Sequence, residues 1–537
     1  MSLKLTNEGL KKTEAWKEKQ VKLPEYDREK MAERTLKEPV WIHFGAGNIF
    51  RGFIAGLQQR LLNAGEADKD IIAAETFDDE IIDRIYKPFD SLTLMISLKP
   101  DGGTDREVIA SLADGWKASP RFGEDWSRLE KAFAWPGLQM ASFTITEKGY
   151  ALRDMHGDLM PVVLQDLEEG PAHARHAMSI VTALMLKRFE NGAAPMALVS
   201  MDNCSHNGEK LRGSVLEIAE GWTKKGFAPE AFLAWISDET KVSFPWSMID
   251  KITPRPADSI TRQLTEEGFE DMAPVQTAKH TYIAPFVNAE IPQYLVVEDR
   301  FPNGRPALEK AGVYMTDRDT VNKTERMKVT TCLNPLHTAL AVNGCLLGYT
   351  LIADEMKDPD LKRLVERIGY AEGLPVVTDP GILSPKDFLR EVLEQRLPNP
   401  FMPDTPQRIA CDTSQKVPIR FGETIKSRLA AGTAGELEGI PLAIAAWLRY
   451  LLAVDDKGEA MQVSPDPMAE NLQQALAGIR FGEPDSMGEN LRPILANAVI
   501  FGTDLTKTPL TDKIERNFRI MLEAGGVRKA LQSCPEP

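Results

Sequence analysis

The stretch VWIHFGAGNIFRGFIAGLQQRLLNAG, residues 40–65, decides the fold class of this chain. A short apolar run ends at Gly45, a second glycine follows at Gly47, and apolar residues then recur at helical spacing until Gly65. This order predicts a buried strand, a tight turn and a helix. Glycines in such a turn let the backbone approach a pyrophosphate, whose charge is stabilised at the helix N-terminus. A purely structural glycine turn is the alternative, because Phe50 stands where the usual third glycine is expected.

Further strand candidates follow along the first half of the chain, at residues 71–74, 92–98, 138–146 and 195–201. They alternate with helical segments, a pattern typical of a parallel sheet covered by helices on both faces. After about residue 310 helical patterns dominate and strand signals nearly vanish. The chain is therefore expected to fold as α/β, with an N-terminal Rossmann-like, doubly wound domain over residues 1–310 and a mainly α-helical domain over residues 311–537.

The composition limits which partners the protein can bind and in which cellular compartment it is expected. The net charge of −15 argues against nucleic acid or an anionic membrane as a partner, since both favour a basic surface. Five cysteines form no CxxC pair, and no apolar run approaches the about 20 residues that a membrane span needs. We expect a cytoplasmic protein without a metal site, because the one HxxH pair, His173 and His176, has no nearby Glu or Cys and is better explained as a helix start.

Acidic residues follow the second predicted strand in AAETFDDE, residues 73–80. A carboxylate at this position of a dinucleotide-binding fold accepts hydrogen bonds from the adenosine ribose. Glu75 lies nearest the strand end and Asp78 is the second candidate. Because carboxylates repel a ribose 2′-phosphate, NAD is expected as cofactor in preference to NADP.

The segment ERMKVTTCLNPLHTALAV, residues 325–342, carries the candidate chemistry. Asn334 and His337 are three residues apart and share a helix face, and Asn334-Pro335 is typical of a capped helix start. Lys328 is expected on a separate, preceding turn. A partly desolvated lysine can act as general acid and base, and a neutral amide can polarise a carbonyl oxygen. An ordinary capped helix with a surface lysine is the alternative that these residues alone leave open.

Seven blocks together resemble the polyol-specific long-chain dehydrogenase/reductase family, which contains mannitol dehydrogenases, fructuronate reductases and tagaturonate reductases. In chain order they are GAGNIFRGF, FTITEKGY, SMDNCSHNG, FPWSMIDKITP, VEDRFPNGRPALEKAGV, MKVTTCLNPLHTALA and TPQRIACDTSQK. The resemblance implies a metal-independent dehydrogenase that interconverts a ketone and a secondary alcohol on a small sugar-derived substrate.

The resemblance also implies roles for individual residues. Lys328 matches the catalytic lysine, Asn334 and Asn203 match the two asparagines that polarise the carbonyl oxygen, and His337 matches the histidine beside the reacting carbon. Glu325 matches a carboxylate linked to proton passage. The substrate-contacting positions are Asp250, Arg408 and Lys416. The cofactor-binding positions are Gly45, Gly47, Asn48, Phe50, Arg51, Glu75, Thr146, Glu147 and Lys148.

Some of these residues could instead have a purely structural role. Asp250 could form a surface ion pair with Lys251, and Arg408 could pair with Asp404 or Asp412. The chain also departs from the family pattern, because five residues rather than four separate Lys328 from Asn334.

The substrate expected from the resemblance is a keto-hexuronate, with D-fructuronate and D-mannonate as the interconverted pair. A carboxylate clamp could use Arg408 and Lys416, and Arg420 lies one helical turn beyond Lys416. Alternatives are mannitol 2-dehydrogenase or tagaturonate reductase activity, a sugar-acid epimerase with bound NAD, and a non-catalytic nucleotide-binding protein. A monomer or small homo-oligomer is expected.

Overall fold

The computed structural model describes residues 2–537, which form two compact units. The first unit ends at Asn322 and the second is Lys323–Pro537. Residues 311–322, expected with the helical region, thus belong to the first unit. Each unit is described separately below.

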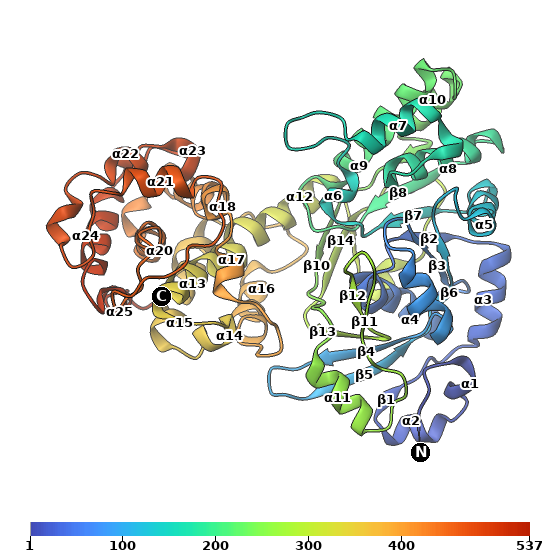
Figure 1. The fold of residues 1–537 in the computed structure, drawn as a ribbon, viewed down its shortest axis with the longest axis horizontal. Helices are drawn as coiled ribbons and strands as arrows, with labels where there is room; N and C mark the ends of the chain where they lie inside the picture. The colour runs from blue at the N-terminus through green and yellow to red at the C-terminus, as the bar shows by residue number, and fades with distance from the viewer. Residues whose placement is uncertain (1) are drawn as a thin grey trace. The chain divides into compact units, whose positions relative to one another are not determined.

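A six-stranded parallel sheet organises the first unit (Figure 1). Its strand order is β6-β3-β2-β7-β8-β9, the order in which two βαβαβ halves meet in dinucleotide-binding domains. The expected Rossmann-like architecture is confirmed. The strands are β6 (Leu112–Lys117), β3 (Ile71–Glu75), β2 (Trp41–Phe44), β7 (Met140–Phe143), β8 (Met196–Ser200) and β9 (Val242–Ser243).

Successive side chains of these strands enter two different cores, one on each face of the sheet. Ile42 and Phe44 of β2 pack in one core with residues of α5 (Gly123–Ala134), α8 (Ala177–Glu190) and α9 (Asn207–Lys224). Trp41 of the same strand packs in the other core, with residues that follow the glycine turn in α4 (Ala55–Asn63) and the π-helical segment before it. Because strand side chains alternate between faces, this division shows a sheet that is covered on both sides.

One predicted strand lies in a different sheet. The run at residues 92–98 forms β4 (Thr93–Leu98), which was expected in the parallel sheet and instead joins a four-stranded sheet of order β1-β5-β4-β13. It pairs antiparallel with β5 (Thr104–Ile109) and parallel with β13 (Phe286–Glu290). Its apolar sequence reflects burial, which is the same in both sheets. A third sheet contains β10 (Ser247–Asp250), β14 (Tyr294–Glu298) and β15 (Tyr314–Thr316).

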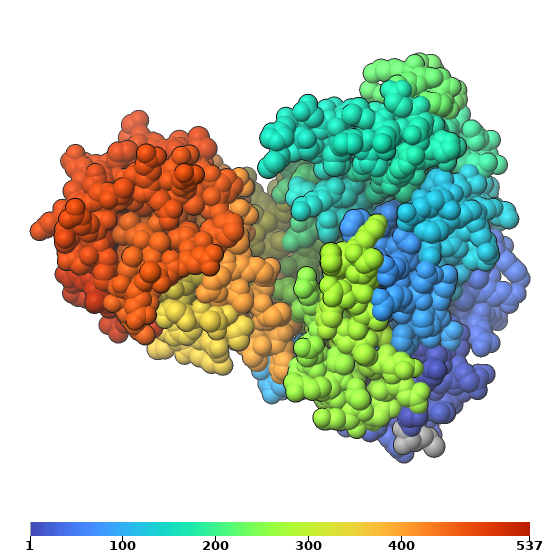
Figure 2. Space-filling view, viewed as in Figure 1, coloured from blue at the N-terminus to red at the C-terminus, as the bar shows by residue number. Residues whose placement is uncertain are grey.

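The polar N-terminal segment is packed against the rest of the first unit. Leu3, Leu5 and Trp16 are buried, and the backbone of Leu3 bridges that of Phe269. Figure 2 shows the yellow-green residues around α11 (Asp258–Glu266) beside the blue N-terminal residues. This segment therefore contributes to the folded unit.

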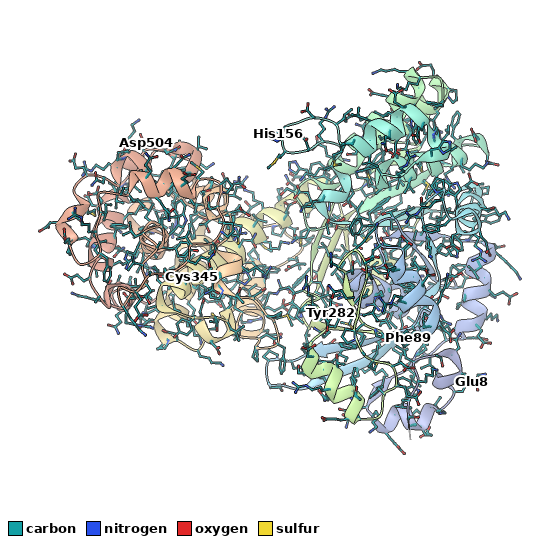
Figure 3. All side chains as sticks on the ribbon, viewed as in Figure 1. Glu8, Phe89, His156, Tyr282, Cys345 and Asp504 are labelled. Carbon is teal, nitrogen blue, oxygen red and sulfur yellow. The ribbon has the colours of Figure 1, made fainter. Side chains whose placement is uncertain are left out.

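The second unit is built from helices. Its central helix, α13 (Asn334–Leu347), packs against α17 (Pro406–Ile409), α18 (Thr413–Arg420) and α20 (Gly439–Tyr450). Cys345, labelled in Figure 3, lies on α13 and is buried. The expected mainly helical C-terminal region is confirmed, and α13 brings its neighbours to the residues discussed below. Between residues 2 and 537, no helix combines the length and apolar character needed to cross a membrane.

Candidate active site

The glycine turn lies at the carboxyl ends of β2 and β7, where the strand order of the sheet reverses. Gly45 has φ of +106°, and a Cβ there would lie 2.2 Å from the carbonyl oxygen of Thr144, which follows β7. A Cβ on Gly47 would meet no atom within 4 Å, so that residue borders open space. The helix begins directly after the turn, since the Arg51 N–H donates to the Gly47 carbonyl at 3.1 Å. A crossing point with open space at a helix N-terminus fits a dinucleotide pyrophosphate.

Glu75 ends β3 beside this turn. One carboxylate oxygen accepts the Ala46 N–H at 2.7 Å, and the other accepts the N–H groups of Phe77 and Asp78 at 2.7 and 3.1 Å. Burial raises the pKa of Glu75, and these backbone bonds oppose that effect. Glu75 is therefore buried at the end of β3, and both of its carboxylate oxygens accept backbone N–H groups of the turn and of the segment that follows the strand. Asp78, the second candidate, is buried and accepts the Thr277 hydroxyl at 2.6 Å.

The other expected residues of the turn differ in what they can offer a ligand. Phe50 is fully buried and stacks on His43, with ring centroids 4.0 Å apart. Arg51 is also buried and donates to Asn48 Oδ1 and to the Ala284 carbonyl, each at 2.9 Å. The side chains of Phe50 and Arg51 thus hold the start of the helix in place. Of Asn48, Phe50 and Arg51, only the half-buried Asn48 is exposed enough for a cofactor to contact it in this conformation.

The loop after β7 is held by a residue that the sequence argument missed. Asp202 accepts the N–H groups of Ile145 and Thr146, each at 2.9 Å, and the Tyr150 hydroxyl at 2.6 Å. Thr146 has φ of +63°, so these bonds stabilise an uncommon backbone conformation. Glu147 and Lys148 follow on the same short helix, α6 (Thr146–Tyr150), where Glu147 pairs with Lys210. Asp202 adjoins Asn203 within the block SMDNCSHNG, and this adjacency was the available signal.

Asn203 and Asp250 are both in the first unit, on elements that Asn207 links. Asn203 lies in the loop between β8 and α9, and Asp250 is the buried last residue of β10. Asn207 donates to the Asp202 carbonyl and to Ser247 at 3.0 Å, and accepts the Ser247 N–H at 3.0 Å. The Asn203 loop is therefore tied to the start of the strand that ends at Asp250. The Lys251 ammonium donates to the carbonyls of Glu290 and Ile291.

Lys328 begins a π-helical segment, η6 (Lys328–Cys332), and its side chain is 2% exposed. The Leu333 N–H donates to the Lys328 carbonyl at 3.1 Å, which closes a turn of i to i+5 spacing. Such a turn holds one residue more than an α-helical turn and recurs at functional sites. It accommodates the additional residue that separates Lys328 from Asn334 in this chain. Glu325 lies one turn earlier, on α12 (Arg318–Met327), and is half-buried.

The helix start at Asn334 differs from the prediction. The break falls at Leu333, with φ of −131° and ψ of −62°, so Asn334 is the first helical residue and Pro335 the second. The predicted cap is wrong: within residues 2–537 no hydrogen bond is recorded for the Asn334 side chain, and Leu333 has no polar atom to cap the helix. The expectation that Lys328 precedes a separate helix is confirmed. The half-buried amide of Asn334 is left to bind a ligand.

Asp404 links two expected site residues, His337 and Arg408. Its Oδ2 lies 3.8 Å from His337 Nε2, and its Oδ1 pairs with the Arg408 guanidinium. The Arg408 side chain is 63% exposed and that of Asp404 is 11% exposed. Arg408 therefore forms the ion pair with Asp404 that the sequence analysis gave as an alternative. The positive charge of Arg408 is balanced by this carboxylate. Asp404 lies in the proline-rich connector LPNPFMPDTPQR, residues 397–408, where no motif marked it as a site residue.

Lys416 and Arg420 share one face of α18, because they are four residues apart. Lys416 Nζ donates to the carbonyls of Ile409, at 3.0 Å, and Cys411. Arg420 Nη1 donates to the Thr338 hydroxyl at 2.7 Å. Burial lowers the pKa of both groups, that of Arg420 to about 10, and the positive charge of Arg420 lowers that of Lys416 further.

The histidine pair considered as a metal site has another role. His176 precedes α8, and its ring accepts the Met178 N–H at 3.2 Å, as expected of a helix start. Across residues 2–537, no group of three or more His, Cys, Asp or Glu side chains is arranged to hold a metal ion.

Comparison with known proteins identifies the family. Residues 40–310 match the mannitol dehydrogenase Rossmann domain, and residues 320–522 match the mannitol dehydrogenase C-terminal domain. The chain belongs to the mannitol dehydrogenase family. The expected family and the expected dehydrogenase class are thereby confirmed.

Several members of this family are similar over almost the whole chain. D-mannonate oxidoreductase of Thermotoga maritima is 50% identical over 535 residues, 99% of this chain and 98% of that protein. A mannitol 2-dehydrogenase of Cereibacter sphaeroides is 30% identical over 84% of this chain and 87% of that protein.

Solved structures agree with the fold. The mannitol 2-dehydrogenase of Pseudomonas fluorescens, solved as a ternary complex with NAD and D-mannitol, is 27% identical, covers 99% of both chains and has a TM-score of 0.69. A D-sorbitol dehydrogenase in substrate-free form has a TM-score of 0.78 at 24% identity, with 95% of this chain and 97% of that one covered.

Proposed function

We propose that this protein is an NAD-dependent, metal-independent oxidoreductase that interconverts D-fructuronate and D-mannonate. The observation that carries the proposal is the 50% identity, over 99% of the chain, to a D-mannonate oxidoreductase. The glycine turn, its open side at Gly47 and the carboxylate of Glu75 support NAD as the cofactor, as does the NAD complex of the Pseudomonas fluorescens relative. NAD when bound exchanges a hydride with the reacting carbon.

In the second unit, three residues of the proposed catalytic group surround one helix start. Lys328, buried just before α13, is proposed as the general acid and base, because an amine that gives and takes protons near neutral pH must be partly desolvated. Asn334 polarises the substrate carbonyl oxygen as a neutral donor, which does not compete for the proton. His337 adjoins the reacting carbon, and Asp404 near its Nε2 holds the ring in place.

The remaining roles follow from the family match. Asn203 is proposed as the second asparagine on the carbonyl oxygen, and Asp250, Arg408 and Lys416 as substrate contacts. Glu325 passes the proton between Lys328 and solvent. Gly45, Gly47, Asn48 and the loop of Thr146, Glu147 and Lys148 border the cofactor. We propose a cytoplasmic location and a monomer or small homo-oligomer.

A neutral polyol and its ketose are the second candidate pair, supported by the mannitol 2-dehydrogenases among the relatives. Tagaturonate is a third candidate substrate. An epimerase with bound NAD and a non-catalytic nucleotide-binding protein would keep parts of the same fold, whereas the relatives named above are described as dehydrogenases or oxidoreductases.

The experiment is a substrate panel. D-fructuronate, D-tagaturonate and D-fructose are each supplied with NADH or NADPH, and oxidation of the cofactor is followed by absorbance. We expect kcat/KM to be highest for D-fructuronate with NADH. A higher value for D-fructose would assign the polyol activity instead. Conversion without net cofactor oxidation would indicate an epimerase, and no conversion of any sugar would contradict an enzymatic role.

A further inference from the structure

Lys416 and Arg420 form a pair of positive charges without a carboxylate partner in the structure. Within residues 2–537 neither group forms an ion pair with an Asp or Glu side chain, although the chain carries an excess of acidic residues. Burial lowers the pKa of Lys416, the charge of Arg420 lowers it as well, and the charge of Asp412 opposes both effects. The Lys416 ammonium donates to the carbonyls of Ile409 and Cys411. Arg420 donates one of its five N–H groups to the Thr338 hydroxyl. Most donors of Arg420 thus remain available to a ligand.

Such a pair is costly unless an anion binds to it. Both groups are partly buried, and two like charges one helical turn apart repel each other. Arg408, by contrast, is paired with Asp404 and largely exposed. An incoming carboxylate would have to compete with Asp404 at Arg408 but would meet an unbalanced positive charge at Arg420.

The pair also lies at the right place along α13. Arg420 is bonded to Thr338, which is four residues after Asn334 and therefore on the same face of that helix. Four residues of an α-helix rise about 6 Å. In D-fructuronate four C–C bonds separate the keto carbon from the carboxylate carbon, about 5 Å in an extended chain. The spacing between Asn334 and the Thr338 contact of Arg420 is therefore similar to the length of the substrate between its keto carbon and its carboxylate.

We propose that Arg420, assisted by Lys416, binds the substrate carboxylate and gives the enzyme its preference for a sugar acid over a neutral sugar. The inference rests on the proposed function and assigns Arg420 a role as a specificity residue. Arg408, whose charge is already paired with Asp404, is then left to contact the hydroxyl groups of the substrate together with Asp250.

The test compares charged and neutral substrates in Arg420→Gln. With NADH as donor, kcat/KM for D-fructuronate should fall about 10- to 100-fold, the usual effect of losing a hydrogen bond to a charged group. The value for D-fructose should stay within about threefold, because that substrate has no carboxylate. Arg420→Lys should recover part of the loss. Arg390→Gln, which removes an arginine paired with Asp387 on α16 (Pro385–Glu391), is the matched control and should change neither substrate.

A stability measurement separates this role from a structural one. Because Arg420 is a partly buried charge without an acidic partner, Arg420→Gln should melt at the same temperature as the wild type or higher. A lower melting temperature with equal loss for both substrates would overturn the inference, as would an unchanged ratio of D-fructuronate to D-fructose activity. If the wild type does not reduce D-fructuronate, the proposed function fails first and this inference with it. If it does and the variant keeps the ratio, the inference alone fails.

Discussion

The substitution Asn334→Ala can distinguish an effect on catalysis from an effect on helix stability. The sequence predicted that Asn334 caps α13, but in the structure it does not. A true asparagine cap is worth about 1 kcal/mol, and its loss would lower the melting temperature. Here the side chain of Asn334 makes no recorded hydrogen bond within residues 2–537, and the residue lies inside the first turn of α13. Alanine is a better helix former than asparagine by about 0.5 kcal/mol, so the stability of the variant should be unchanged or slightly higher.

The catalytic effect of the same substitution should be large. Removal of one donor to a developing oxyanion costs about 10²–10³-fold in kcat, equivalent to about 2.7–4 kcal/mol. We would measure kcat with saturating NADH and D-fructuronate, and the thermal unfolding midpoint by circular dichroism. The Kd for NADH should change little, since the dinucleotide-binding residues are in the first unit.

The second unit offers a matched control for this experiment. Asn497 accepts the Val499 N–H at 3.0 Å and is a genuine cap of α23 (Ala498–Phe501). Asn497→Ala should lower the unfolding midpoint by about 2–4 °C, as expected for about 1 kcal/mol in a unit of this size, and leave kcat unchanged. The reasoning is refuted if Asn334→Ala is destabilised like Asn497→Ala, or if its kcat stays within threefold of the wild type.

Four further outcomes are expected. Lys328→Ala should lower kcat about 10²–10⁴-fold with little change in the Kd for NADH, and near-normal turnover would remove Lys328 from catalysis. The kcat/KM for NADH should exceed that for NADPH at least about tenfold, or about 1.4 kcal/mol, whereas equal use would show that Glu75 does not face the ribose. Activity should survive prolonged dialysis against a chelator, and loss that added zinc restores would contradict a lysine-centred reaction. Burial raises the pKa of Asp70 from 3.8 to about 7, so the free energy of unfolding should fall as the pH rises between these values, because the unfolded form loses its proton first. Asp70→Asn should therefore raise the free energy of unfolding by up to about 4 kcal/mol at pH 8 and by little at pH 4. Equal urea midpoints for the variant and the wild type at pH 8 would argue against a buried charge at Asp70.

The fold class could be predicted because it depends on local patterns. The strand, turn and helix around Gly45 are encoded within residues 40–65, and the same alternation recurs along the first unit. The partner of β4 could not be predicted in this way. Its neighbour β13 begins almost two hundred residues later, at Phe286, and an apolar run shows that a strand is buried without showing beside which strand.

The identities of the candidate site residues were accessible from motifs, whereas their surroundings were not. Asp202 supports the Thr146 loop through two backbone bonds. The sequence places it beside Asn203 in the block SMDNCSHNG, but does not show which backbone groups its carboxylate accepts. The spacing after Lys328 showed one additional residue. Whether that residue forms a loop or a π-turn depends on how tightly the segment is packed, and Thr330, Thr331 and Cys332 are all buried. The same packing moves the helix break to Leu333 and removes the predicted cap.

The ionic partners of the arginines in the second unit could not be predicted from the sequence. Arg408 and Arg420 are both arginines near Lys416, and from spacing either could hold a substrate carboxylate. The structure separates them through contacts that no local pattern encodes: Arg408 meets Asp404, from the proline-rich connector, and Arg420 meets the neutral hydroxyl of Thr338 on α13. An arginine is effective as an anion site where its positive charge is not already balanced. This difference in surroundings, rather than the spacing of the arginines, is what leads us to propose Arg420 as the carboxylate contact.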